Sequence, residues 1–169
     1  MMTKDNAERI KRLKAEVSSF GRNQKDYCYD LNTQNAYRIE HTKLGSYAYI
    51  LVNDFDQGKE VKVDLDDFYT YRLYSYRWNR SHSDPQHDYP HTNVPNRTGK
   101  KTNLQLHALI LGTVVGKVID HNDGDHYNAS RSNLNHVTTA QNNQNRHPRY
   151  TKAKTTTRPM PSEYVPLFA

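Results

Sequence analysis

The sequence predicts a small α+β protein, and three observations support this prediction. Apolar residues recur at spacings of three and four between Ala7 and Phe20, which is the period of an α-helix. Val61, Val63 and Leu65 alternate with polar residues, which is the period of a half-buried strand. Only 34% of the 169 residues are hydrophobic and 25% are charged, so the length and composition indicate one modest domain with loose segments.

Residues 1–103 are expected to hold one helix followed by strands. The amphipathic helix covers residues 5–19, with Asp5 and Asn6 as cap candidates and Gly21 at its end. Four strands are expected after it, at residues 27–31, 36–41, 46–52 and 61–65. We therefore divide this part into an N-terminal helix at 1–20 and a β-rich region at 21–103, which is a possible DNA-contacting surface.

Two unusual segments fall within the β-rich region. Residues 68–78 interleave aromatic side chains with arginines, which suits base stacking, although aromatic core filler is the commoner use. Residues 79–101 are polar and proline-containing, and they are expected to form a long loop or an irregular hairpin. This segment ends in a basic cluster, made of Arg97, Lys100 and Lys101.

The C-terminal half is expected to alternate short helices and strands. A short apolar helix is predicted at 104–112, a brief strand at 117–119 and a helix at 138–146 that Thr138 or Thr139 would cap. From residue 147 the chain is rich in proline and threonine, so a disordered or extended tail is expected over 148–169.

Charge and apolar content limit the class of protein. The net charge is +6, and from Ser130 onward six Lys/Arg face a single acid, Glu163, which favours a polyanionic partner. Ordinary solvated side chains remain an equally open explanation. The apolar runs are too short to cross a membrane, and the first 15 residues are charged and lack the apolar stretch of a secretory signal, so an intracellular protein is expected.

The segment from Asp120 to Asn142 carries the residues with the clearest chemistry. Hydrolysis of a phosphodiester needs a base near neutrality, which His121 can supply. It also needs a hard cation, for which Asp120 and Asn142 offer oxygen ligands. Neighbouring strand residues point to opposite faces, so a twist or bulge must bring Asp120 and His121 into one site.

Two other interpretations of this segment are weaker. An EF-hand calcium loop starting at Asp120 would have Gly124 at position five, Asp125 at position six and Arg131 at position twelve, which fails at all three. A plain strand and Asn-rich turn explains the abundance of Asn and Gly but not the Asp-His pair.

The segment resembles the HNH nucleases of the ββα-metal type, especially the phage and intron-associated subgroup that includes homing endonucleases. The motif residues stand in the expected order: Asp120-His121, Gly124, Asn128, Asn133-Leu134, Val137-Thr138 and Gln141-Asn142. The preceding Leu106–Gly112 also fits. Two positions depart from the pattern, because Ala108 and Ala129 stand where arginine is usual.

The resemblance implies a ββα-metal nuclease core at 104–147 and a role for each motif residue. His121 would be the general base, Asp120 and Asn142 would hold one Mg²⁺ or Mn²⁺, and Asn133 would fix the loop that orients the imidazole. His107 would be an auxiliary residue, and a histidine packed on the sheet is an equal alternative. His126 is expected to be a surface or loop residue. DNA contacts are expected from six basic residues: Arg97, Lys100, Lys101, Arg131, Arg146 and Arg149.

The function that follows is metal-dependent hydrolysis of double-stranded DNA to 5′-phosphate and 3′-hydroxyl ends. A single active site cuts one strand, so cutting both strands would require a homodimer or a second binding event. The resemblance places such an enzyme in the cytoplasm of a bacterium or a phage-infected host. Two alternatives stay open. One is an HNH-fold nucleic-acid-binding module without turnover. The other is a protein-interaction subunit that uses the surface of residues 68–101.

Overall fold

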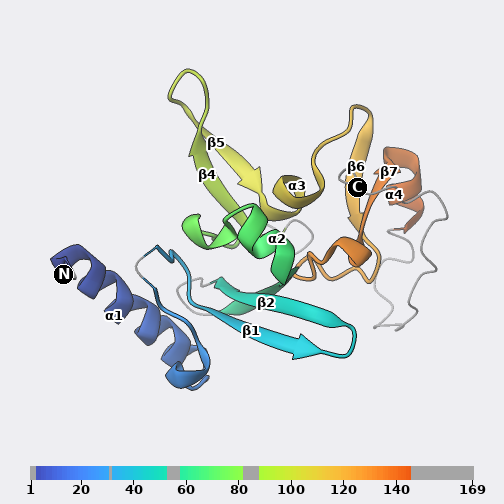
Figure 1. Cartoon of the computed structure of the whole chain (residues 1–169). Helices are drawn as coiled ribbons and strands as arrows, with labels where there is room; N and C mark the ends of the chain where they lie inside the picture. Colours follow the sequence, from blue (N-terminus) through green and yellow to red (C-terminus); the bar gives the residue numbers. More distant parts are fainter. Residues whose placement is uncertain (1–2, 31, 53–57, 82–87, 146–169) are drawn as a thin grey trace.

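The computed structural model describes residues 3–30, 32–52, 58–81 and 88–145. These residues form an α+β architecture with a three-stranded sheet and two hairpins, as Figure 1 shows. The expected tail lies outside the described residues, and so do Arg146 and Arg149. Within the described ranges, no helix has the length and apolar content that a membrane span requires.

The predicted N-terminal helix is confirmed as α1 (Lys4–Ser19). The cap differs from the expectation. Thr3, rather than Asp5 or Asn6, accepts a hydrogen bond from the Asn6 N–H at 3.3 Å, so the helix starts one residue earlier. Gly21 follows the helix with φ of +75°. The buried face of α1 packs on the sheet through a small cluster, made of Leu13, Val17, Tyr27, Ala36 and Leu51.

The sheet is antiparallel and runs in the order β1 (Tyr37–Thr42), β2 (Gly45–Val52), β3 (Lys59–Asp64). Alternation along β2 separates two cores, because Leu51 faces α1 while Ile50 and Val52 face the main core.

The strand expected at 27–31 is wrong. Cys28 makes only an isolated bridge to Tyr37, and the Asp30 carboxylate accepts hydrogen bonds from the Asn32 N–H and the Thr33 hydroxyl, which turns the chain.

The aromatic segment fills the main core. It forms α2 (Leu65–Thr70) and a 3₁₀ turn (Leu73–Ser75), and Phe68, Leu73 and Trp78 are fully buried. The Trp78 indole N–H donates to the Leu73 carbonyl at 2.8 Å, so its single polar atom is satisfied. Of the two uses considered for these aromatics, core filler is the one that Phe68 and Trp78 adopt.

A hairpin and a short helix follow, as expected, but the hairpin extends to Gln105, so the helix begins at Leu106 and not at Leu104. Residues 82–87 of the expected loop lie outside the described residues. The hairpin consists of β4 (His91–Pro95) and β5 (Lys101–Gln105), and it stands out from the body of the molecule in Figure 1. Helix α3 (Leu106–Leu111) follows directly and ends at Gly112, which has φ of +75°. Leu106, Ile110 and Leu111 enter the main core.

The chain then forms a hairpin and a helix. Strands β6 (Lys117–His121) and β7 (Leu134–Thr138) pair antiparallel, and α4 (Thr139–Asn145) follows. The Thr138 hydroxyl accepts from the Gln141 N–H while the Gln141 side chain accepts from the Thr138 N–H, which is a capping box.

The β6–β7 loop docks on the edge of β3. The Lys62 N–H donates to the Tyr127 carbonyl, and the Ala129 N–H donates to the Lys62 carbonyl. The loop that joins the two strands is therefore attached to the first sheet.

We expect Asn35→Ala to destabilise the fold strongly. The Asn35 side chain is 2% exposed, donates to the Leu51 and Trp78 carbonyls, and accepts from the Trp78 N–H. Its removal leaves these buried backbone groups unpaired, which should lower the free energy of unfolding by about 2 kcal/mol or more. Urea denaturation measures this loss. Asn32→Ala, at an exposed position, is the control and should stay within about 0.5 kcal/mol of the parent.

Candidate active site at the β6–β7 hairpin

Asn133 holds the loop between β6 and β7. Its amide nitrogen donates to the Asp123 carboxylate at 2.8 Å and to the Asn128 carbonyl at 2.7 Å, and its amide oxygen accepts from the Asp123 N–H at 3.0 Å. Asp123 in turn accepts from the Asn128 amide and the Asp125 N–H. These bonds cross-link residues 123–133 immediately after His121, so they fix the backbone that carries the imidazole.

His121 ends β6 in a cluster of rings. It is 3% exposed, and its ring centroid lies 5.2 Å from that of His107, 5.4 Å from that of His126 and 5.9 Å from that of Tyr89. Within the described part of the chain, its Nε2 atom is buried without a hydrogen-bond partner. Burial first, and then the neighbouring imidazoles, lower the pKa of His121 to about 3. The ring is therefore neutral at pH 7, and it is a weaker base than the near-neutral one expected from the sequence.

His107 of α3 belongs to the same cluster. It is 6% exposed, packs edge-on against Tyr89 at 5.1 Å, and has a buried Nδ1 atom without a hydrogen-bond partner among the described residues. Burial lowers its pKa to about 4. The sequence left open whether His107 packs on the sheet or serves the site, and its position beside His121 is compatible with both.

Two members of the ring cluster were not found from the sequence. Tyr89 lies in a polar segment with no motif around it, and only the fold brings it to His121. His126 is a loop residue, as expected, but it is half-buried and stacks on Tyr89 with ring centroids 4.0 Å apart. The clustering of His121 and His126 five residues apart, across a Gly-containing turn, is the one sequence signal that could have indicated His126.

The Asp120 side chain contacts α4. Because successive strand residues point to opposite faces, Asp120 directs its carboxylate to the helix and accepts from the Asn145 amide at 2.8 Å. The expected partner on α4 was Asn142. Asn142 and Asn145 are three residues apart, so they share one face of the helix.

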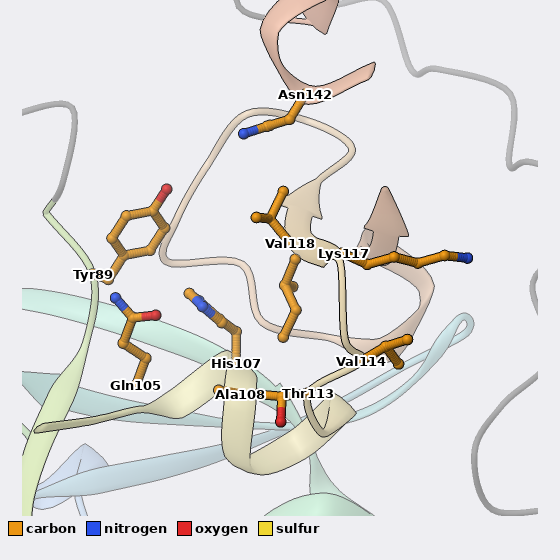
Figure 2. Close-up of a pocket in the computed structure, with 10 residues that line it drawn as sticks. Tyr89, Gln105, His107, Ala108, Thr113, Val114, Lys117, Val118 and Asn142 are labelled. Carbon is orange, nitrogen blue, oxygen red and sulfur yellow. The ribbon is translucent and has the colours of Figure 1, made fainter. Parts of the chain in front are cut away.

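Asn142 instead lines a cavity of about 300 Å³ that also includes His107 and Tyr89. Figure 2 shows the Asn142 side chain entering this space from α4, across from His107 and Tyr89, with Val118 of β6 between them. The structure therefore brings Asp120, His121, His107 and Asn142 to a region around β6. Asp120 contacts α4 through Asn145, and the His121 ring packs against the His107 ring.

The residues expected to hold a cation are Asp120 and Asn142. Residues 3–30, 32–52, 58–81 and 88–145 contain no group of three or more His, Cys, Asp or Glu side chains placed to hold a metal ion. The expected pair consists of one carboxylate and one amide, whose oxygens are ligand types that Mg²⁺ accepts when other oxygens complete its shell. The oxygen types of Asp120 and Asn142 suit such an ion, while the contact seen between Asp120 and α4 is the hydrogen bond from Asn145.

The predicted DNA-contacting residues divide into two groups. Arg97, Lys100 and Lys101 are exposed on the β4–β5 hairpin. Arg131 is directed inward instead, because its guanidinium donates to the Asp67 carboxylate, the Tyr71 hydroxyl and the Ile110 carbonyl. Burial raises the pKa of Asp67 although Arg131 opposes this shift. The Arg131 guanidinium is thus used within the protein, and its expected phosphate contact stays a prediction.

The two alanines that depart from the family pattern have different surroundings. Ala129 is 1% exposed in the main core, where a longer side chain has no room. Ala108 lines the cavity next to His107, so the absence of an arginine side chain leaves that space open.

A scan against protein-family models, a search of curated proteins and a search of solved structures each return no match to this chain. The functional interpretation therefore depends on the residues and their geometry.

The buried neutral His107 should make the protein less stable in mild acid. The folded-state pKa is about 4 and the unfolded value is 6.5, so below pH 6.5 the unfolded chain binds more protons and the free energy of unfolding falls. Between pH 7 and pH 5, His107 should account for a loss of about 2 kcal/mol. Urea denaturation at both pH values, in the parent and in His107→Gln, measures this contribution. An unchanged pH dependence in the variant would contradict it.

Proposed function

We propose that this protein is a metal-dependent endonuclease of the HNH type that hydrolyses DNA phosphodiester bonds. The observation that carries the proposal is the β6–β7–α4 unit. In it, one end of a hairpin holds His121 with an unpartnered buried ring nitrogen among the described residues, and the neighbouring Asp120 meets the helix that carries Asn142. This order of strand, loop, strand and helix matches the sequence resemblance.

In this proposal His121 takes the proton from the attacking water. A general base needs a ring nitrogen without a fixed partner, and Nε2 meets that condition within the described chain. The contacts with His107 and Tyr89 restrict the rotation of the ring, so the nitrogen keeps one direction. Asn133 acts as a positioning residue, because it holds the loop after His121 and does not itself touch the reacting atoms.

Asp120 and Asn142 would hold the divalent cation. A Mg²⁺ or Mn²⁺ ion there would neutralise charge on the phosphoryl oxygens and on the departing 3′ oxygen. Asn145 orients the Asp120 carboxylate through its 2.8 Å hydrogen bond. Water attack at phosphorus with departure of the 3′ oxygen leaves 5′-phosphate and 3′-hydroxyl ends, and a single site cuts one strand at a time.

We expect the full chain to nick supercoiled plasmid in the presence of Mg²⁺ and to stop in EDTA. His121→Ala should lower the nicking rate by about 100-fold or more, since the general base is lost. His41→Ala, at an exposed histidine on β1, is the matched control and should keep the parent rate. Gel separation of supercoiled and relaxed plasmid measures the rates. Equal nicking by His121→Ala and the parent would refute the role of His121.

The two α4 asparagines should separate cation binding from carboxylate orientation. Asn142→Ala should raise the Mg²⁺ concentration needed for half-maximal nicking by about 10-fold or more, because a proposed ligand is removed. Asn145→Ala should have a smaller effect, because it removes a hydrogen bond to Asp120 and not a proposed ligand. Titration of Mg²⁺ in the plasmid assay distinguishes the two, and a larger effect of Asn145→Ala would exchange their roles.

An HNH-fold binding module without turnover is the second candidate, and the low exposure of His121 favours it. Such a module would retard labelled DNA in a gel but would leave plasmid intact at every Mg²⁺ or Mn²⁺ concentration. If the chain shows neither nicking nor retardation, the protein-interaction subunit is supported instead.

A further inference from the structure

The β4–β5 hairpin presents one polar face to solvent. Residues that lie directly opposite each other in an antiparallel pair share a face, and the pairs His91–Gln105, Asn93–Asn103 and Pro95–Lys101 lie on the same side of this ribbon. Asn93, Lys101, Asn103 and Gln105 are all exposed. The other face carries Thr92, Val94 and Leu104, which are buried or half-buried, and Thr102, which is exposed. The base of the hairpin therefore packs on the body through Thr92 and Leu104, and three amides lie on the opposite face.

The amides on this face are available to a ligand. Within the described part of the chain, no side-chain hydrogen bond involves Asn93, Asn103 or Gln105. Each amide can donate and accept at the same time, which is the pattern needed to recognise a base edge. Gln105 sits at the base of the ribbon and also lines the cavity with His107 (Figure 2). The exposed face thus continues into the candidate active site.

The turn of the hairpin adds fixed positive charge. The Asn96 side chain accepts hydrogen bonds from the Thr98 and Lys100 N–H groups, both at 3.0 Å, which holds the turn in one conformation. Arg97, Lys100 and Lys101 are exposed on it. The sequence from residue 89 to residue 119 contains no Asp or Glu, so no acidic side chain of this segment offsets these cations.

We infer that the β4–β5 hairpin is a sequence-reading arm that enters the major groove of double-stranded DNA. The major groove of B-DNA admits a two-stranded ribbon, and asparagine or glutamine pairs with the N6 and N7 edge of adenine. Asn93 and Asn103 read bases from the centre of the ribbon, and the cations of the turn contact phosphates. The deep, narrow major groove of duplex RNA would not admit the ribbon. The inference rests on the proposed function only in that it places the bound DNA beside the proposed site.

The test is a selection of binding sites followed by variants of each part. DNA duplexes with a randomised core are bound by the full chain in EDTA, which prevents cleavage, and are then sequenced. The parent should select a short consensus that contains adenine. In Asn93→Ala/Asn103→Ala, affinity for the selected duplex should fall by about 10-fold or more, while affinity for a scrambled duplex should not change.

The basic turn should behave differently from the amides. Three single variants should weaken binding to the selected and the scrambled duplex alike: Arg97→Ala, Lys100→Ala and Lys101→Ala. Each should reduce the slope of log affinity against log salt by about 0.9. Lys11→Ala, exposed on α1, is the control and should not change the slope.

Three outcomes would overturn the inference: selection of no consensus, an unchanged consensus in the double asparagine variant, or tighter binding of duplex RNA. Failure of the plasmid assay with hairpin-dependent DNA binding intact would refute the nuclease and leave the arm. If the parent nicks plasmid and the hairpin variants bind DNA like the parent, the arm is refuted and the nuclease is retained.

Discussion

The ion pair of Arg131 with Asp67 joins the parts of the molecule on which the candidate site depends. The Arg131 N–H donates to Asp64 at the start of α2, and its guanidinium donates to Asp67 and to the Ile110 carbonyl of α3. The Asp67 side chain is 7% exposed, so the pair is largely desolvated, and removing one partner would leave a buried charge at a cost of about 3 kcal/mol or more. One side chain thus fixes the β6–β7 loop against the two helices that precede it.

Beside this ion pair, the candidate site combines buried neutral imidazoles with a carboxylate. The imidazoles of His107 and His121 are buried and neutral, whereas Asp120 on the adjacent face of β6 is a carboxylate held by α4. A strand allows this separation because its side chains alternate. The same alternation lets the β4–β5 hairpin pack on the body through Thr92 while it leaves Asn93 and Asn103 exposed. Short antiparallel pairs therefore support both the proposed chemistry and the proposed recognition.

Local patterns were reliable where one energetic term dominates. The period of α1, the alternation in β3 and the capping residues of α4 are properties of neighbouring residues, and the structure agrees with each. The prediction of a strand at 27–31 was wrong because the Asp30 carboxylate accepts a hydrogen bond from the Asn32 N–H, and this bond competes with strand pairing. Thr3 replaced the expected caps of α1 for a similar reason, since several nearby side chains can cap and only geometry selects one.

The sequence by itself determined the α+β class, the order of most elements, and the candidate residues Asp120, His121, Asn133 and Asn142. Tertiary structure alone decided that Tyr89 and His126 surround His121, that Asn145 rather than Asn142 contacts Asp120, and that Arg131 points inward. These outcomes depend on contacts between residues far apart in the chain or on the rotation of a helix about its axis. Neither is encoded in local periodicity, because burial against a distant partner decides both.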